Sequence, residues 1–92
     1  MTKHPSAQKR HRQSEKRRQR NQAIKTRLRH LVREVRAAVA AADGQAAMAS
    51  LVRASRALDK AVTKGVLHRN NAARRAGRLA RAVHAITASK AS

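Results

Sequence analysis

The side chains best suited to chemistry in this sequence are the arginines and lysines of one short stretch near its start. From Gln8 to Gln22 the chain reads QKRHRQSEKRRQRNQ and contains no apolar residue. Guanidinium and ammonium groups bind phosphate oxygens, and a merely solvated surface would mix the two signs of charge more evenly. We therefore predict that this stretch binds a polyanion on all sides of one helix. The candidate contacts are Lys9, Arg10, Arg12, Lys16, Arg17, Arg18, Arg20 and Asn21, continued by Lys25 and Arg29.

A second candidate site lies between Lys64 and Arg75, where the sequence is KGVLHRNNAARR. These twelve residues hold a helix end, a turn and the start of another helix, together with one histidine, two asparagines and three arginines. A helix N-terminus surrounded by such side chains binds anions, although an ordinary turn with an asparagine cap also explains the pattern. The candidates here are Lys64, His68, Arg69, Asn70, Asn71, Arg74, Arg75 and, one turn further, Arg78.

Catalytic and metal-binding chemistry find no support in the residues. The five histidines are never three or four positions apart, and there is no cysteine. We expect no metal, no cofactor and no enzymatic activity. Asp43 lies in a predicted turn, and Asp59 is expected to pair with a nearby arginine. Because Phe, Tyr and Trp are absent, aromatic base-stacking surfaces are excluded, and recognition would rest on phosphates, 2′-hydroxyls and the shape of a folded RNA.

The composition indicates the same kind of partner. Lys and Arg number 23 against four acids in 92 residues, which gives a formal net charge of +19. Such a field attracts nucleic acid first and a membrane surface second. The longest apolar run has six residues, whereas roughly 18 are needed to span a bilayer. No signal-peptide pattern opens the sequence. We expect one small cytoplasmic domain without membrane association.

Apolar residues at steps of three and four predict three amphipathic helices, over about 6–43, 45–64 and 68–87. The first seam is Ile24, Leu28, Leu31, Val35, Ala38 and Ala42. The second is Met48, Leu51, Ser55, Leu58 and Val62, with Arg53, Arg56, Lys60 and Lys64 on the opposite face. The third is Ala72, Ala76, Leu79, Val83 and Ile86.

Caps and helix breakers separate these segments. Ser6 is expected to cap the first helix, and Asp43-Gly44 to end it, with the glycine in the left-handed conformation. Gly65 is expected to end the second helix, and Asn70 or Asn71 to cap the third.

No alternating strand pattern occurs, so the predicted fold class is all-α: an antiparallel three-helix bundle with a long, basic, protruding N-terminal helix. The single domain is expected to cover 6–87, between tails at 1–5 and 88–92. Val66 and Leu67 are expected to close one end of the core. The first helix overhangs the other two by about 16 residues, or roughly 24 Å at about 1.5 Å per residue.

Several segments, in order and at matching spacing, resemble one known family. They are Ser6-Ala7, Lys9-Arg10, Gln13 to Arg17, Arg20-Asn21, Leu58 to Ala61, Lys64 to Asn70 and Ala72 to Arg74. The chain is similar to the S-twenty family of bacterial small-subunit ribosomal proteins, and its KGVLHRN element is the most specific part of the match. Gly77 departs from the serine usual in that family, and the first five residues differ from its common opening.

The resemblance implies a structural protein lodged as a monomer, with few protein contacts, in the small-subunit (16S) ribosomal RNA. It also implies direct, early binding that stabilises the RNA fold, with contacts to the five-prime domain and to the long helix near the three-prime end.

Three alternatives remain open from the sequence. A nucleoid-type DNA-binding protein would use the same phosphate attraction. A basic-zipper dimer has a similar outline, but its seam would break at Asp43-Gly44. A membrane-active cationic helix is disfavoured because the chain has no Trp or Phe anchors.

Overall fold

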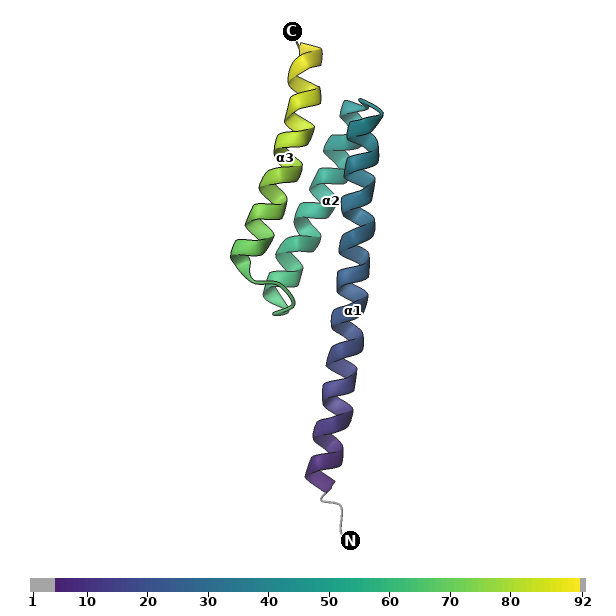
Figure 1. Cartoon of the computed structure of the whole chain (residues 1–92), viewed down its shortest axis with the longest axis vertical. Coiled ribbons are helices and arrows are strands. Elements are labelled where there is room, and N and C mark those ends of the chain that lie inside the picture. Colours follow the sequence, from purple (N-terminus) through teal and green to yellow (C-terminus); the bar gives the residue numbers. More distant parts are fainter. Residues whose placement is uncertain (1–4, 92) are drawn as a thin grey trace.

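Three helices make up the computed structural model, which describes the backbone of residues 5–91 and the side chains of residues 6–88. They are α1 (Pro5–Ala40), α2 (Gly44–Thr63) and α3 (Arg69–Ala91), and the described part of the chain contains no strand. Figure 1 shows α2 and α3 packed beside the second half of α1, whose first half extends beyond the α2–α3 turn. The molecule measures 73 × 22 × 14 Å. The predicted all-α class with a long first helix is confirmed.

The helix bounds differ slightly from those expected. Because α1 begins at Pro5, Ser6 lies in its first turn and is not its N-cap, while the rest of the expected tail, residues 1–4, lies outside the described residues. Proline suits the first position of a helix, since its missing N–H has no partner there. At the other end, α3 continues to Ala91, past the expected boundary at 87.

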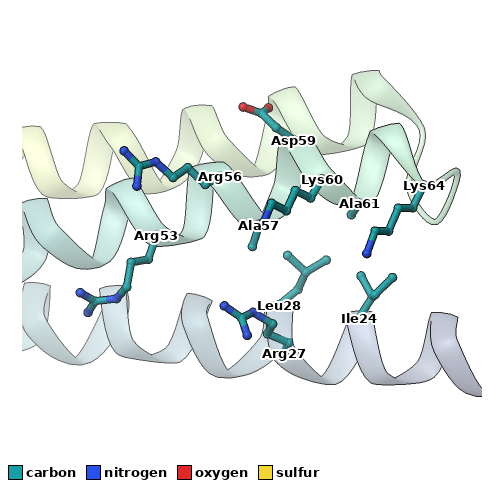
Figure 2. Close-up of a pocket in the computed structure, with 10 residues that line it drawn as sticks. All are labelled: Ile24, Arg27, Leu28, Arg53, Arg56, Ala57, Asp59, Lys60, Ala61 and Lys64. Carbon is teal, nitrogen blue, oxygen red and sulfur yellow. The ribbon is translucent and has the colours of Figure 1, made fainter.

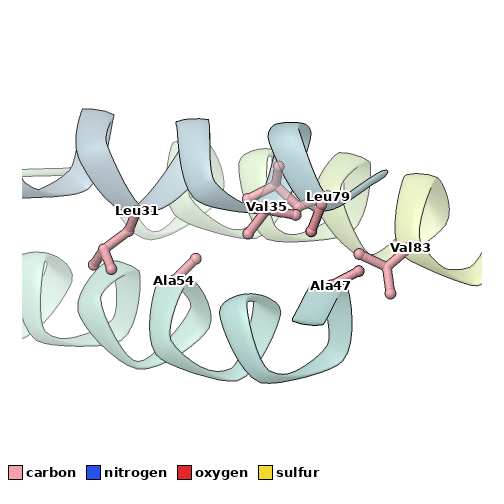
Figure 3. Close-up of a cluster of buried hydrophobic side chains, with 7 residues drawn as sticks. Leu31, Val35, Ala47, Ala54, Leu79 and Val83 are labelled. Carbon is pink, nitrogen blue, oxygen red and sulfur yellow. The ribbon is translucent and has the colours of Figure 1, made fainter. Parts of the chain in front are cut away.

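The core consists of two clusters stacked along the bundle. The first, shown in Figure 3, joins side chains of all three helices: Leu31, Val35, Ala38, Ala47, Ala54, Leu79 and Val83. The second lies nearer the α2–α3 turn and contains Leu28, Leu58, Ala61 and Ala72. Val66 and Leu67 pack against this second cluster, as predicted. The seams of α1 and α3 were therefore predicted correctly, apart from Ala42.

The buried face of α2 is rotated from the predicted seam. Its buried residues are Ala47, Ser50, Ala54, Leu58 and Ala61. Met48, expected in the core, is 48% exposed, and the neighbouring Val52 is 45% exposed. The reason is that α2 packs against both other helices, and small side chains at the contacts let the helices approach closely. Of the predicted seam, Leu51, Leu58 and Val62 do pack in the core, so hydrophobicity found this face only in part.

The α1–α2 connection places the left-handed residue at Ala42 and not at Gly44. Ala42 has φ 53°, and its N–H donates to the Val39 carbonyl at 3.0 Å while the Asp43 N–H donates to the Ala38 carbonyl at 3.0 Å. These two bonds form a Schellman motif with alanine at the position that glycine usually occupies. Asp43 then caps α2, because its Oδ1 accepts from the Ala46 N–H at 3.2 Å.

The α2 C-terminus repeats this motif with the favoured residue. Gly65 has φ 75°, as the sequence predicted, and its N–H donates to the Val62 carbonyl at 3.0 Å. The Val66 N–H donates to the Ala61 carbonyl at 2.8 Å, which brings Val66 back onto the core. The turn is thereby held at a fixed place beside α1.

Replacing Ala42 by glycine should stabilise the bundle. A left-handed alanine costs about 1–2 kcal/mol, of which the greater freedom of glycine in the unfolded chain cancels part, so Ala42→Gly should gain about 0.5–1 kcal/mol. Urea unfolding followed by circular dichroism measures this. The control is Ala37→Gly, at an exposed helical position of α1, which should lose up to about 1 kcal/mol. A less stable Ala42→Gly variant would contradict the assigned turn.

Two glycine-to-alanine substitutions should have opposite effects. A Cβ at Gly77, inside α3, would meet only the Arg81 Nη2 atom, at 3.8 Å, so Gly77→Ala should stabilise the protein by up to about 1 kcal/mol. Gly65→Ala meets no atom within 4 Å but forces alanine into the left-handed region, and should destabilise by about 1 kcal/mol. Thermal unfolding of both variants measures the two changes in stability. Two changes of the same sign would contradict this prediction.

Candidate nucleic-acid interface

Most cations in the first half of α1 have no other part of the protein beside them. Ile24 is the first described residue of α1 that packs against either core cluster. Before it, seven candidate cations are all exposed: Lys9, Arg10, Arg12, Lys16, Arg17, Arg18 and Arg20. Since successive residues are about 100° apart on a helix, these side chains project on all sides. We call residues 6–20 of α1 the protruding segment.

Within the protruding segment, Glu15 accepts from Arg18 Nη2 at 3.0 Å. Both side chains are largely exposed, so the pair adds little stability. It neutralises one of the arginines but leaves the segment strongly cationic.

Arg20 joins the protruding segment to the bundle. Its Nη2 donates to the backbone carbonyl of Lys64, the C-cap of α2, at 3.3 Å, and to Oδ1 of Asn21 at 3.5 Å. A cation at a helix C-terminus is favourable because the last carbonyls lack partners and carry partial negative charge. Arg20 and Asn21, expected as polyanion contacts, thus lie where α1 leaves the bundle, and this bond brings the two candidate stretches together.

In the second stretch, His68 is the cap of α3. Its Nδ1 accepts from the Asn70 N–H at 3.1 Å, and its carbonyl accepts from the Ala72 N–H at 3.1 Å. The predicted caps, Asn70 and Asn71, are therefore wrong, since both lie inside the helix. Asn71 is half-buried and its Oδ1 accepts from Arg75 Nε at 2.8 Å.

The remaining candidates are exposed along the bundle. Lys25 and Arg29 lie on the second half of α1, Lys64 lies at the end of α2, and Arg69, Arg74, Arg75 and Arg78 lie on α3. The structure thus gathers one group on the protruding segment and a second group around the α2–α3 turn, with further cations along two helices.

A groove between α1 and α2 was missed by the sequence reasoning. It has a volume of about 570 Å³ and is lined by Ile24, Arg27, Leu28, Arg53, Arg56, Ala57, Asp59, Lys60, Ala61 and Lys64. Figure 2 shows Ile24 and Leu28 rising from α1 and the Lys64 side chain pointing toward Ile24 from α2, while the Lys60 side chain lies along α2. The cations of α2 were expected on the face opposite its seam, but the rotation of α2 places them beside α1. The sequence signal that pointed to this groove was Arg27, a cation three residues after the apolar Ile24 of the α1 seam.

The few acids leave the surface positive. Glu34 pairs with Arg53 at 3.4 Å, and Asp43 caps a helix. Asp59 was expected to pair with an arginine, but it makes no ion pair with any described residue, because its side chain points away from α1. Within residues 5–91, no group of three or more His, Cys, Asp or Glu side chains could hold a metal, and no helix is long and apolar enough to cross a membrane.

A slender helical bundle that carries one long, exposed, cationic helix belongs to the class of small basic proteins suited to nucleic acid. Residues 2–84 match the family described as Ribosomal protein S20. A relative from Oleidesulfovibrio alaskensis is 50% identical over 94% of this chain and 99% of its own length. Another, from Corynebacterium diphtheriae, is 59% identical over 77% of this chain and 82% of its own. Both are named small ribosomal subunit protein bS20.

The chain therefore belongs to the ribosomal protein S20 family, a family of small-subunit ribosomal proteins and not of enzymes. The resemblance seen in the sequence is confirmed.

Proposed function

We propose that this chain is a structural component of the bacterial small ribosomal subunit that binds small-subunit ribosomal RNA directly and stabilises its fold during assembly. The observation that carries this proposal is the protruding segment, whose cations have no acidic partner apart from Glu15 among the described residues. The protein works in the cytoplasm as one copy per ribosome, with few protein contacts and no cofactor.

The geometry of the protruding segment favours a crevice in folded RNA over a single groove. A helix with side chains is about 10–12 Å across, and phosphates on several sides could reach its cations simultaneously. Base edges in the deep, narrow major groove of A-form RNA are inaccessible to side chains, so the contacts are with phosphates and 2′-hydroxyls. The second group, around His68 and Arg69, binds RNA where the α2–α3 turn meets it.

Binding also compensates for the missing tertiary support of the segment. An isolated helix of about 12–15 residues is marginal in water, and like charges four positions apart weaken it further. Phosphates remove that repulsion and release condensed counterions, so RNA stabilises the helical form that it binds.

The apolar seam of α1 argues against the zipper alternative. Leu28, Leu31 and Val35 are at most 8% exposed, because they pack against α2 and α3 of the same chain. A second copy finds no free seam there.

Reversing two charges in the protruding segment should weaken RNA binding. For Arg17→Glu with Arg18→Glu we expect at least tenfold weaker binding to a transcript of the five-prime domain of small-subunit ribosomal RNA. The slope of log K against log salt should fall by about two, one for each lost phosphate contact. Filter binding at several salt concentrations measures both quantities, and circular dichroism should show the bundle intact.

The matched control is Arg33→Glu with Arg36→Glu, which makes the same change in net charge at exposed positions of the bundle half of α1. Its loss of affinity and of salt slope should be smaller. If the two double variants behave alike, net charge and not the protruding segment determines binding.

RNA binding should also survive competition by duplex DNA. A protein that fits a folded RNA should remain on the transcript in mass excess of non-specific duplex, because phosphate attraction alone does not provide the fit. A filter-binding competition measures this. Equal competition by RNA and DNA would favour the nucleoid-type DNA-binding function.

A further inference from the structure

The α1–α2 groove combines an apolar floor with a cationic rim. Ile24 and Ala57 are half-buried on its floor, above the buried Leu28. Lys60 and Lys64 border it from α2, and Arg27 borders it from α1 (Figure 2). Its volume of about 570 Å³ lies within the range of roughly 300–1,000 Å³ that is typical of sites for small molecules.

The charges around the groove select an anionic occupant. Asp59 is the one acid among the lining residues, and its carboxylate points away from α1 in Figure 2. Neither Lys60 nor Lys64 is paired with a carboxylate among the described residues. A ligand that fits must present an apolar face to the floor and negative charge to the rim.

The groove adjoins the protruding segment. Lys64 lines the groove with its side chain, and its backbone carbonyl accepts from Arg20, the last residue of that segment. An RNA strand that follows the cations of α1 towards the bundle therefore reaches the groove next. An unpaired nucleotide in that strand has both features that the groove requires, a flat base and a phosphate.

We propose that the α1–α2 groove binds one unpaired nucleotide of RNA, with the base against the half-buried Ile24 and Ala57 and the phosphate on Lys60 and Lys64. The Arg27 guanidinium stacks on the outer face of the base, as arginine does in other RNA complexes. This site rests on the proposed function, and it gives a protein without aromatic residues a means of binding a base.

The two isoleucines of the chain provide a direct test on the unaltered protein. Ile24 lies on the groove floor, whereas Ile86 packs against the other core cluster, so a spectrum of labelled isoleucine δ1 methyls contains one probe and one internal control. On addition of the five-prime-domain transcript, the Ile24 methyl should shift upfield from the ring current of the base and show contacts to base protons. The Ile86 methyl should stay in place.

Filling the groove floor tests its contribution to affinity. Ala57→Leu keeps the net charge and a strong helix former, and should weaken binding of the transcript roughly tenfold, within the range for losing one stacked base. The matched control is Ala49→Leu, at an exposed position of the same helix outside the groove, which should bind as tightly as the unaltered protein. Thermal unfolding shows whether either variant has lost its fold. The isoleucine methyl test uses the unaltered protein and does not depend on these variants.

The outcomes separate this proposal from the function on which it rests. If the transcript binds tightly while Ile24 shifts no more than Ile86, the groove proposal is wrong and the proposed function stands. If the transcript does not bind at all, both are wrong. If polyglutamate shifts Ile24 as far as RNA does, the groove recognises negative charge alone and the nucleotide site is wrong.

Discussion

Repulsion among like charges in the protruding segment is the constraint on which the rest of the structure depends. Seven lysines and arginines lie between Lys9 and Arg20, with Glu15 as the one acid among them. No side chain of α2 or α3 relieves this repulsion, because the bundle begins only at Ile24. In the proposed function a phosphate-rich partner offsets it, and the same continuous helix connects that partner to a folded core. The bundle therefore holds the second half of α1, while most of the first half extends beyond it.

The bundle is suited to this role because it is narrow and because the end that carries the α2–α3 turn is bonded to α1. Alanine and serine at the α2 contacts keep the helices close, which leaves a molecule only 22 × 14 Å across its shorter axes. At that end, the Schellman motif is centred on Gly65, and the preceding residue, Lys64, accepts the Arg20 hydrogen bond at its carbonyl. Together they fix the α2–α3 turn against the point where α1 emerges, so the direction of the free helix is set by the bundle.

The sequence predicted those features that depend on one helix and one face. The seams of α1 and α3 include leucine and valine at their buried positions, and their periodicity identified the buried residues. The seam of α2 was found only in part, because its closest contacts are made by alanine, which hydropathy ranks below Met48. The left-handed residue at Ala42 was missed since Gly44 lay two positions away, and the His68 cap was missed since asparagine is the commoner cap.

The candidate site likewise has one part that the sequence predicted and one part that it did not. The cations of the protruding segment can be recognised from the sequence alone, since apart from Arg20 they contact no other helix. The α1–α2 groove is not, because it depends on how α2 is rotated relative to α1, and a predicted seam that was displaced by one residue put Lys60 on the wrong face. The KGVLHRN element indicated the family, but in the structure its residues end one helix and begin the next, so a specific motif did not by itself reveal which of its side chains are free to bind.

Specificity in such a protein must come from geometry. Phosphate contacts do not distinguish one sequence from another, and the chain has no aromatic side chain with which to stack on several bases. Under the proposed function, a rod 73 Å long that carries cations at one end and a turn with further cations near its middle can satisfy both only on an RNA whose phosphates have the matching separation. An unstructured chain of equal charge would adapt to any polyanion. In the proposed function, the continuous α1 helix and the Arg20 bond to the Lys64 carbonyl therefore convert a general electrostatic attraction into recognition of one folded surface.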